Sequence, residues 1–391
     1  MNLKYKTFLI LFLIHQCIIS FAQKPEKVYG IAEINKPYEW YISQSKLWEI
    51  ELKKDKKNPE AWLNFYRANR AAKQKAPNNE WQYNSDKILN ELDLIVKDAE
   101  KSIPNTFDLY YIKSLNTLRN EDPFPYVLKA YQIDPERYEV YSFLAVHYTQ
   151  EGNKSKLEEV CKKWHASQEY DAALLAWNYN LLKTVDDNAV LFTSGDNNTF
   201  PLWILQNALS IKKNVQVLNI PLLTSNSDYI NKVFKELQLS PYNKTQKDFK
   251  GQLEYYQELT TYITSNLKDK PIYFAAGTDD KLFKNYESNI YLVGLAFKYS
   301  KTPIDNLAYL KRNFEGEYLM DHVRVRFENE KSYSMMNEMN FAYIAPLIKL
   351  YHHYKISEDN QRTAEIKIDL LKIARESGNE QIVASVLNAL Y

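Results

Sequence analysis

Similar residue types recur at an offset of 34 residues, and this recurrence constrains the fold more than any other feature of the sequence. A recurrence of this length is typical of an array in which each small structural unit packs on the next. We therefore expect a repetitive helical region in the first half of the chain. The pairs that carry it are Phe107 and Tyr141, Tyr111 and Ala145, Val127 and Cys161, and Ala130 and Trp164.

The segment that starts at Tyr141 resembles a tetratricopeptide repeat. The matching positions are Tyr141, Leu144, Ala145, Tyr148 and Gly152 in the first helix and turn, Leu157, Cys161 and Trp164 in the second helix, and Pro135 before them. The resemblance covers roughly residues 38–183 and is weaker around Phe107 and Trp62. It implies stacked pairs of antiparallel helices, with Cys161 in the core. Such a stack either binds a protein partner in its concave face or serves as a packing platform for the next domain.

Glycine is scarce, with 8 residues in a chain of 391. Average proteins contain roughly 7% glycine. A chain so poor in the residue that turns most freely favours long helices with few hairpins of strands.

Residues 1–23 have the order of a secretory signal peptide: Lys4 and Lys6, an apolar run from Phe8 to Ile14, and then Ser20 to Gln23. The apolar run is too short to span a bilayer. We expect cleavage near Ala22 or Gln23 and a periplasmic or secreted product. The alternative is a retained anchor or a lipoprotein attached through Cys17. We expect no transmembrane segment after cleavage.

The charge and cysteine content exclude several classes of partner and chemistry. Without residues 1–23 the chain has 48 basic and 49 acidic residues, and no basic patch of the kind that binds nucleic acid. Cys161 is then the one remaining cysteine, so we expect no internal disulfide. No HExxH, CxxC, Walker or dinucleotide-binding motif occurs, so we expect no metal, cofactor or catalytic residue.

The pattern changes near Asp186 to short apolar runs that alternate with helical segments. This alternation predicts a small α/β domain with a parallel sheet over residues 186–301. The expected strands are 189–195, 215–223, 271–277 and 289–297, and the expected helices are 202–209, 226–239 and 251–267.

The loops that follow these strands are the candidate binding site, because ligands favour the carboxyl ends of parallel strands. They span residues 195–200, 224–228 and 277–280. In the first loop, Asp196 and Asn197 offer oxygen ligands, and Asn198 or Thr199 is expected to cap the next helix. The alternative is that these side chains only bond their own loop. In the third loop, Asp279 and Asp280 are candidates to join Asp196 as an acid/base pair.

A second resemblance concerns the run AVLFTSGDNNTFPLWILQ (189–206). It resembles the soluble C-terminal region of a family of large bacterial membrane proteins related to protein O-mannosyltransferases. The resemblance continues through residues 215–223, 271–277, 290–300 and 336–350.

This chain departs from the family in two ways. Asn198 stands where the family usually has a second aspartate, which removes one carboxylate ligand. The membrane half with the acidic residues for sugar transfer has no counterpart here, so no catalytic residue is carried over. The resemblance therefore implies an exported accessory domain without transferase activity.

Residues 302–391 return to helical spacing and predict C-terminal helical hairpins, with a helix stop at Ser377-Gly378-Asn379. Met335, Met336 and Met339 are interpreted as core residues. The predicted fold class is α with an α/β insert. The predicted domains are a signal peptide (1–23), tetratricopeptide-like repeats (24–185), the α/β domain (186–301) and a C-terminal helical region (302–391).

Three functions are compatible with these patterns. The favoured hypothesis is an exported, non-enzymatic binding or scaffolding protein whose helical repeats bind a protein partner. The second is a glycan or small-ligand binding module, or an accessory to a membrane glycosyltransferase, with its site at Asp196, Asn197 and Thr199. The third is a glycan-active enzyme that pairs Asp196 with Asp279 or Asp280.

Overall fold

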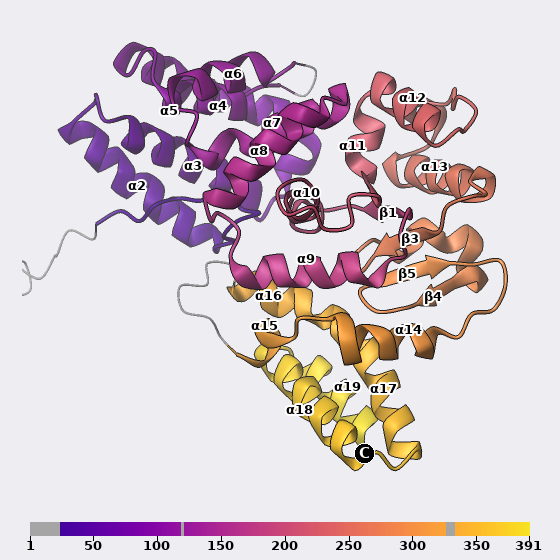
Figure 1. Ribbon diagram of the computed structural model, residues 1–391. Coiled ribbons are helices and arrows are strands. Elements are labelled where there is room, and N and C mark those ends of the chain that lie inside the picture. The colour runs from indigo at the N-terminus through magenta and orange to yellow at the C-terminus, as the bar shows by residue number, and fades with distance from the viewer. Residues whose placement is uncertain (1–23, 119–120, 326–332) are drawn as a thin grey trace, which may run out of the picture. The chain divides into compact units, whose positions relative to one another are not determined.

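The computed structural model describes residues 24–118, 121–325 and 333–391, and these form two compact units that divide after Pro135 (Figure 1). The predicted signal peptide, residues 1–23, lies outside the described residues. Within the described ranges, no helix combines the length and the apolar character that crossing a bilayer requires.

The first unit is built of helices in which consecutive members pack together. Asn58 and Thr106 start two of these helices by accepting hydrogen bonds from backbone N–H groups three residues ahead. The strongest packing joins α2 with α3 and α5 with α6. The helices are α2 (Tyr38–Lys54), α3 (Pro59–Lys75), α4 (Glu80–Ser102), α5 (Phe107–Leu115) and α6 (Phe124–Ile133).

The second unit opens with a short 3-10 turn, η1 (Tyr138–Val140), and the helices α7 (Tyr141–Glu151), α8 (Lys154–Ala166) and α9 (Ala172–Thr184). α7 packs on α8, and Gly152 turns the chain between them with a φ of 66°. Cys161 is fully buried in this pair, as predicted, and burial raises the pKa of its thiol to about 12. It is therefore a packing residue rather than a reactive one.

A five-stranded sheet follows, in the order β2-β1-β3-β5-β4. β1 pairs in parallel with both β2 and β3, whereas β5 is antiparallel to β3 and β4. The prediction of an α protein with an α/β insert is confirmed. The strands are β1 (Val190–Thr193), β2 (Gln216–Asn219), β3 (Ile272–Ala275), β4 (Ile290–Leu292) and β5 (Ala296–Tyr299).

The sheet is mixed rather than wholly parallel because the expected strand 289–297 is two short strands with a turn at Gly294. Gly294 has a φ of 138°, which other residues rarely adopt. A Cβ atom at this position would clash with the hydroxyl of Tyr318 and the amide of Asn313. Asn313 also holds the turn by donating a hydrogen bond to the carbonyl of Val293 at 2.7 Å.

Helices cover the sheet on the way from strand to strand. The β1–β2 connection contains η2 (Asp196–Asn198) and α10 (Phe200–Asn207), and α10 packs on α8 and α9. The β2–β3 connection contributes α12 and α13, which form one core with alternate residues of the strands, among them Phe192 and Phe274. Its elements are α11 (Ile220–Ser225), α12 (Ser227–Glu236), η3 (Gln246–Asp248) and α13 (Gln252–Asn266).

The chain after the sheet is helical, as predicted, and α17 packs on α18, which packs on α19. The predicted stop at Gly378 is confirmed, with a φ of 62° there and an Asn379 side chain that caps α19. The elements after β3 are η4 (Asp280–Asn289), α14 (Asn306–Arg312), the π-helical turn η5 (Asn313–Glu317), α15 (Asp321–Arg324), α16 (Tyr333–Met339), η6 (Asn340–Tyr343), α17 (Ile344–Ile356), α18 (Asn360–Glu376) and α19 (Glu380–Leu390).

Candidate functional site

The strand order creates a switch point between β1 and β3. From β1 the chain crosses to β2 on one side, and it then returns past β1 to form β3 on the other side. The connections after β1 and β3 therefore diverge, and a crevice opens between them where ligands commonly bind. β4 ends and β5 begins at this same edge, since β5 is antiparallel to β3.

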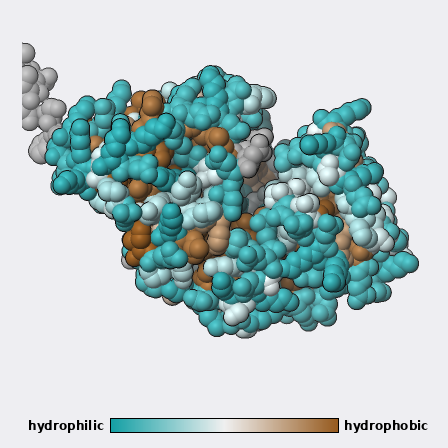
Figure 2. Space-filling view, turned by 90° about the horizontal axis from the view of Figure 1, so that it is seen from above, coloured by the Kyte–Doolittle hydropathy of each residue, from teal (hydrophilic) through white to brown (hydrophobic). Residues whose placement is uncertain are grey.

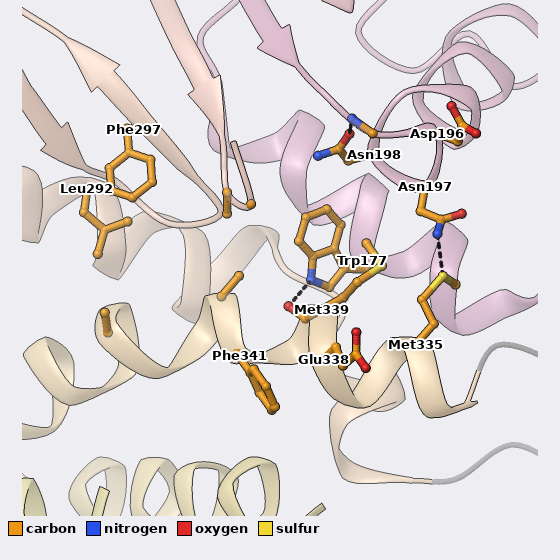
Figure 3. Close-up of a pocket in the computed structure, with 15 residues that line it drawn as sticks. Trp177, Asp196, Asn197, Asn198, Leu292, Phe297, Met335, Glu338, Met339 and Phe341 are labelled. Carbon is orange, nitrogen blue, oxygen red and sulfur yellow. Dashed lines mark hydrogen bonds between the residues drawn. The ribbon is translucent and has the colours of Figure 1, made fainter. Parts of the chain in front are cut away.

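A cavity of about 660 Å³ lies at this edge (Figure 3). Its size falls within the range of roughly 300–1,000 Å³ that is usual for small-molecule sites. The described residues that line it are Trp177, Gly195, Asp196, Asn197, Asn198, Ala276, Gly277, Leu292, Phe297, Met335, Glu338, Met339, Phe341, Ala342 and Ala345.

The walls of the cavity are mainly apolar. Leu292 and Phe297 come from β4 and β5, and Met335 and Met339 come from α16. Trp177 of α9 is almost fully buried, and its indole N–H donates a hydrogen bond to the carbonyl of Met339 at 3.2 Å (Figure 3). This bond joins the helix before the sheet to the helix after it.

The polar side of the cavity is the predicted loop that follows β1. The side chain of Asn198 accepts a hydrogen bond from the backbone N–H of Gly195 at 3.0 Å. The hydroxyl of Thr199 donates to the carbonyl of Gly195 at 2.7 Å and accepts from the side chain of Asn219 at 3.0 Å. Thr199 is buried, and it lies outside the set of described residues that line the cavity. Asn198 and Thr199 thus hold the loop in shape.

The expectation that Asn198 or Thr199 caps the following helix is wrong. Thr199 does precede α10, but neither side chain makes a capping hydrogen bond. The reason is that both side chains are already engaged, Asn198 with Gly195 and Thr199 with Gly195 and Asn219.

Asp196 and Asn197 also line the cavity; Asp196 is exposed and Asn197 is half-buried. The side-chain amide nitrogen of Asn197 contacts the sulfur of Met335 (Figure 3). The backbone carbonyl of Asn197 accepts a hydrogen bond from the side chain of Asn178 at 2.9 Å. The residue Asp196 as a whole is exposed to solvent. Nearby protein atoms nevertheless remove enough water from its carboxyl group to raise the pKa of that group.

Asp279 and Asp280 are exposed and lie outside the set of described residues that line the cavity. The chain turns at Gly277 with a φ of 88°, and Asp279 then accepts a hydrogen bond from the backbone N–H of Lys281 at 3.0 Å. The second carboxylate of the cavity is instead Glu338 of α16. Loop 224–228 contributes no residue to the described lining either.

Sequence reasoning missed Glu338, Trp177 and the aromatic residues of the lining. Glu338 lies more than 130 residues beyond Asp196, and the only signal for its segment was the resemblance over residues 336–350. Among the residues that the structure describes, no group of three or more His, Cys, Asp or Glu side chains is placed to hold a metal ion.

Comparison with known protein families gives a match to part of the chain. No curated protein is similar to the chain. A family model described as TMEM260-associated domain 2 matches residues 175–258, which include Trp177, β1, the loop with Asp196 and Asn197, and β2. This part of the chain is therefore similar to a family that its description links to TMEM260.

Proposed function

We propose that the protein is a non-catalytic binding module that holds a small ligand in the cavity at the carboxyl edge of its sheet. The observation that carries this proposal is the position of a ligand-sized cavity at the switch point between β1 and β3. Its apolar walls supply area that a ligand would bury, and the loop from Gly195 to Asn198 supplies a few polar groups that would orient the ligand.

We propose binding in place of catalysis by a pair of Asp196 with Asp279 or Asp280, because neither Asp279 nor Asp280 is among the described residues that line the cavity. Asp279 is occupied in the turn before η4, and Asp280 is exposed outside the lining. A carboxylate pair that cleaves a glycosidic bond must flank the substrate at roughly 5–10 Å. A glycan stays a possible ligand, bound by Asp196 and Asn197 with Thr199 supporting their loop.

An exported accessory of a membrane glycosyltransferase is the cellular role that we propose for this module. The order of charged, apolar and small residues in 1–23 supports export to the periplasm or beyond. The match to a TMEM260-associated domain and the resemblance of residues 189–206 to proteins related to O-mannosyltransferases support the link to sugar transfer.

The experiment on the cavity uses two matched tryptophan substitutions. Ala345 is exposed on α17 and lines the cavity, whereas Ala364 is exposed on α18 and is not part of the described lining. Octylammonium, octyl glucoside, octyl sulfate and simple mono- and disaccharides serve as probes in thermal-shift and calorimetric titrations.

At least one probe is expected to raise the melting temperature of the wild type and of Ala364→Trp, and to lose this effect in Ala345→Trp. Circular dichroism checks that both variants are folded. The proposal is wrong if no probe binds, or if Ala345→Trp binds every probe as the wild type does.

A second function is proposed for residues 38–183, namely that they are tetratricopeptide repeats that bind a protein partner. The consecutive packing of α2 with α3, α5 with α6, and α7 with α8 supports it. On the face drawn in Figure 2, hydrophobic residues form small groups among hydrophilic ones. The proposal therefore rests on the helix pairs and not on a large apolar patch.

The test of this second function is capture of a partner from envelope extracts. Leu94 on α4 and Ile368 on α18 are both exposed, at 69% and 66%. Leu94→Lys is expected to abolish capture and Ile368→Lys to preserve it. Equal capture by both variants would remove α4 from the partner surface, and an empty capture with the wild type would contradict the function.

A further inference from the structure

The charges that line the cavity all have one sign. Asp196 lies in the loop after β1 and Glu338 lies on α16, and both contribute to the lining. No lysine, arginine or histidine is found among the described lining residues. A ligand that enters therefore meets two carboxylates and otherwise neutral groups.

We propose that the natural ligand carries a protonated amine joined to an apolar body, with the amine at Asp196. The inference deepens the proposed function and rests on it, since it names the class of ligand for the same cavity.

The apolar body is assigned from the shape and composition of the walls. Leu292, Phe297, Met335 and Met339 are all partly exposed, and they line the cavity. Burying an apolar chain against them gains roughly 25 cal/mol for each Å² that leaves water. Methionine side chains adapt to irregular apolar shapes, so the pair on α16 suits a flexible chain as well as a ring.

The amine is assigned from what a bound ligand does to Asp196. The protein already desolvates this carboxyl group, and a ligand seated in the cavity would remove more of its water. A buried carboxylate without a donor is strongly unfavourable, whereas an ammonium group supplies both an opposite charge and N–H donors.

An anionic or a neutral ligand fits the lining less well. An anion would face Asp196 and Glu338 with no cation among the described lining residues to balance it. A neutral sugar can donate hydroxyl hydrogen bonds to Asp196, but these lack the charge assistance that an ammonium gives. It would also leave Leu292 and Phe297 without an apolar group against them.

The experiment compares three probes with the same eight-carbon tail and different head groups: octylammonium, octyl glucoside and octyl sulfate. Isothermal titration at pH 7 and low salt measures each affinity, below the concentration at which the probes form micelles. Octylammonium is expected to bind about tenfold or more tightly than octyl glucoside, and octyl sulfate more weakly than both.

Two substitutions to asparagine test whether Asp196 is responsible for the preference for octylammonium. Asp196→Asn is expected to weaken octylammonium binding about tenfold or more and to leave octyl glucoside binding nearly unchanged. Asp280→Asn is the matched control: Asp280 is exposed and lies outside the described lining, so all three affinities are expected to stay as in the wild type.

The outcomes separate this inference from the proposed function. The inference is wrong if octyl glucoside or octyl sulfate binds as tightly as octylammonium, or if Asp196→Asn still binds octylammonium more tightly than the other probes. In either case the cavity remains a ligand site. If no probe binds, or if Ala345→Trp leaves all binding intact, the proposed function fails as well.

Discussion

The two ends of strand β1 carry the same residue type in opposite situations. Asp186 precedes the strand and is fully engaged, whereas Asp196 follows it and faces a cavity. Asp186 accepts hydrogen bonds from the hydroxyl of Tyr273 and the ammonium of Lys298, both at 2.6 Å. No such bond to the carboxylate of Asp196 is found within the described part of the chain.

Sheet register explains why the first end is engaged. Tyr273 of β3 and Lys298 of β5 are direct cross-strand partners, so their side chains lie on the same face and reach the same carboxylate. Lys298 also donates to the hydroxyl of Tyr309 at 2.6 Å. Burial by itself would raise the pKa of Asp186, but the hydrogen bonds from Lys298 and Tyr273 lower it overall.

The difference teaches which acidic residue holds the fold and which is available for binding. At the first end the partners of the charge are built into neighbouring strands, and at the second end burial raises the pKa with no partner to lower it. A desolvated group that lines a cleft is a common mark of a functional site. Substitutions at the two ends should therefore have opposite effects on stability.

The largest expected effect is at the engaged end. Asp186→Asn leaves the largely buried ammonium of Lys298 without its counter-charge, so we expect a loss of about 2–3 kcal/mol in the free energy of unfolding. Denaturant unfolding measures it. Asp187→Asn is the matched control, since Asp187 is 67% exposed and forms a surface pair with Lys212. That variant should change stability by less than about 1 kcal/mol. Equal losses of stability in Asp186→Asn and Asp187→Asn would show that Asp186 stabilises the fold no more than a surface ion pair does.

A pH series should sharpen this contrast. The pKa of Asp186 is lower in the folded protein than its usual value, so acid protonates the unfolded chain first. The stabilisation by the carboxylate is then complete above about pH 5 and disappears as the pH falls below about 4. The stability difference between the wild type and Asp186→Asn should shrink over that acid range. A difference that stays constant down to pH 3 would contradict the assigned direction.

The smallest effect is expected at the cavity end, and its sign is reversed. Desolvation disfavours the charged form of Asp196 and raises its pKa in the folded protein. The folded protein therefore loses stability as the pH rises from the usual pKa of an aspartate through the raised pKa of Asp196. Asp196→Asn removes that cost and should leave stability at pH 7 unchanged or raised by up to about 0.5 kcal/mol. Thermal melts at pH 7 without added ligand measure this. A clear loss of stability would mean that Asp196 holds the fold as Asp186 does.

The sequence predicted the elements of the fold well where local patterns decide them. The helix pair around Gly152 and the three strands after Asp186 have strong local signals, namely a left-handed turn residue and short apolar runs. The split of residues 289–297 into two strands was missed. Its apolar run reads as continuous, and the close approach of Tyr318 and Asn313 to Gly294 is tertiary information.

The sequence predicted only the part of the cavity lining that comes from the loop after β1. Asp196 and Asn197 follow a recognisable strand, so topology alone places them at its carboxyl end. Glu338, Met335 and Met339 reach the same cavity from a distant helix, and no spacing rule connects them with Asp196. Met336 is buried, which agrees with its interpretation as a core residue. Met335 and Met339 instead line the cavity.

The position of β3 has a consequence for any shortened form of the protein. β3 lies in the middle of the sheet and pairs with β1, yet it begins at Ile272, beyond the segment 175–258 that matches the family model. An excised fragment of that length would leave one side of β1 with unsatisfied backbone N–H and C=O groups. Such an open strand edge invites pairing with other chains, so the fragment should self-associate instead of behaving as an independent module.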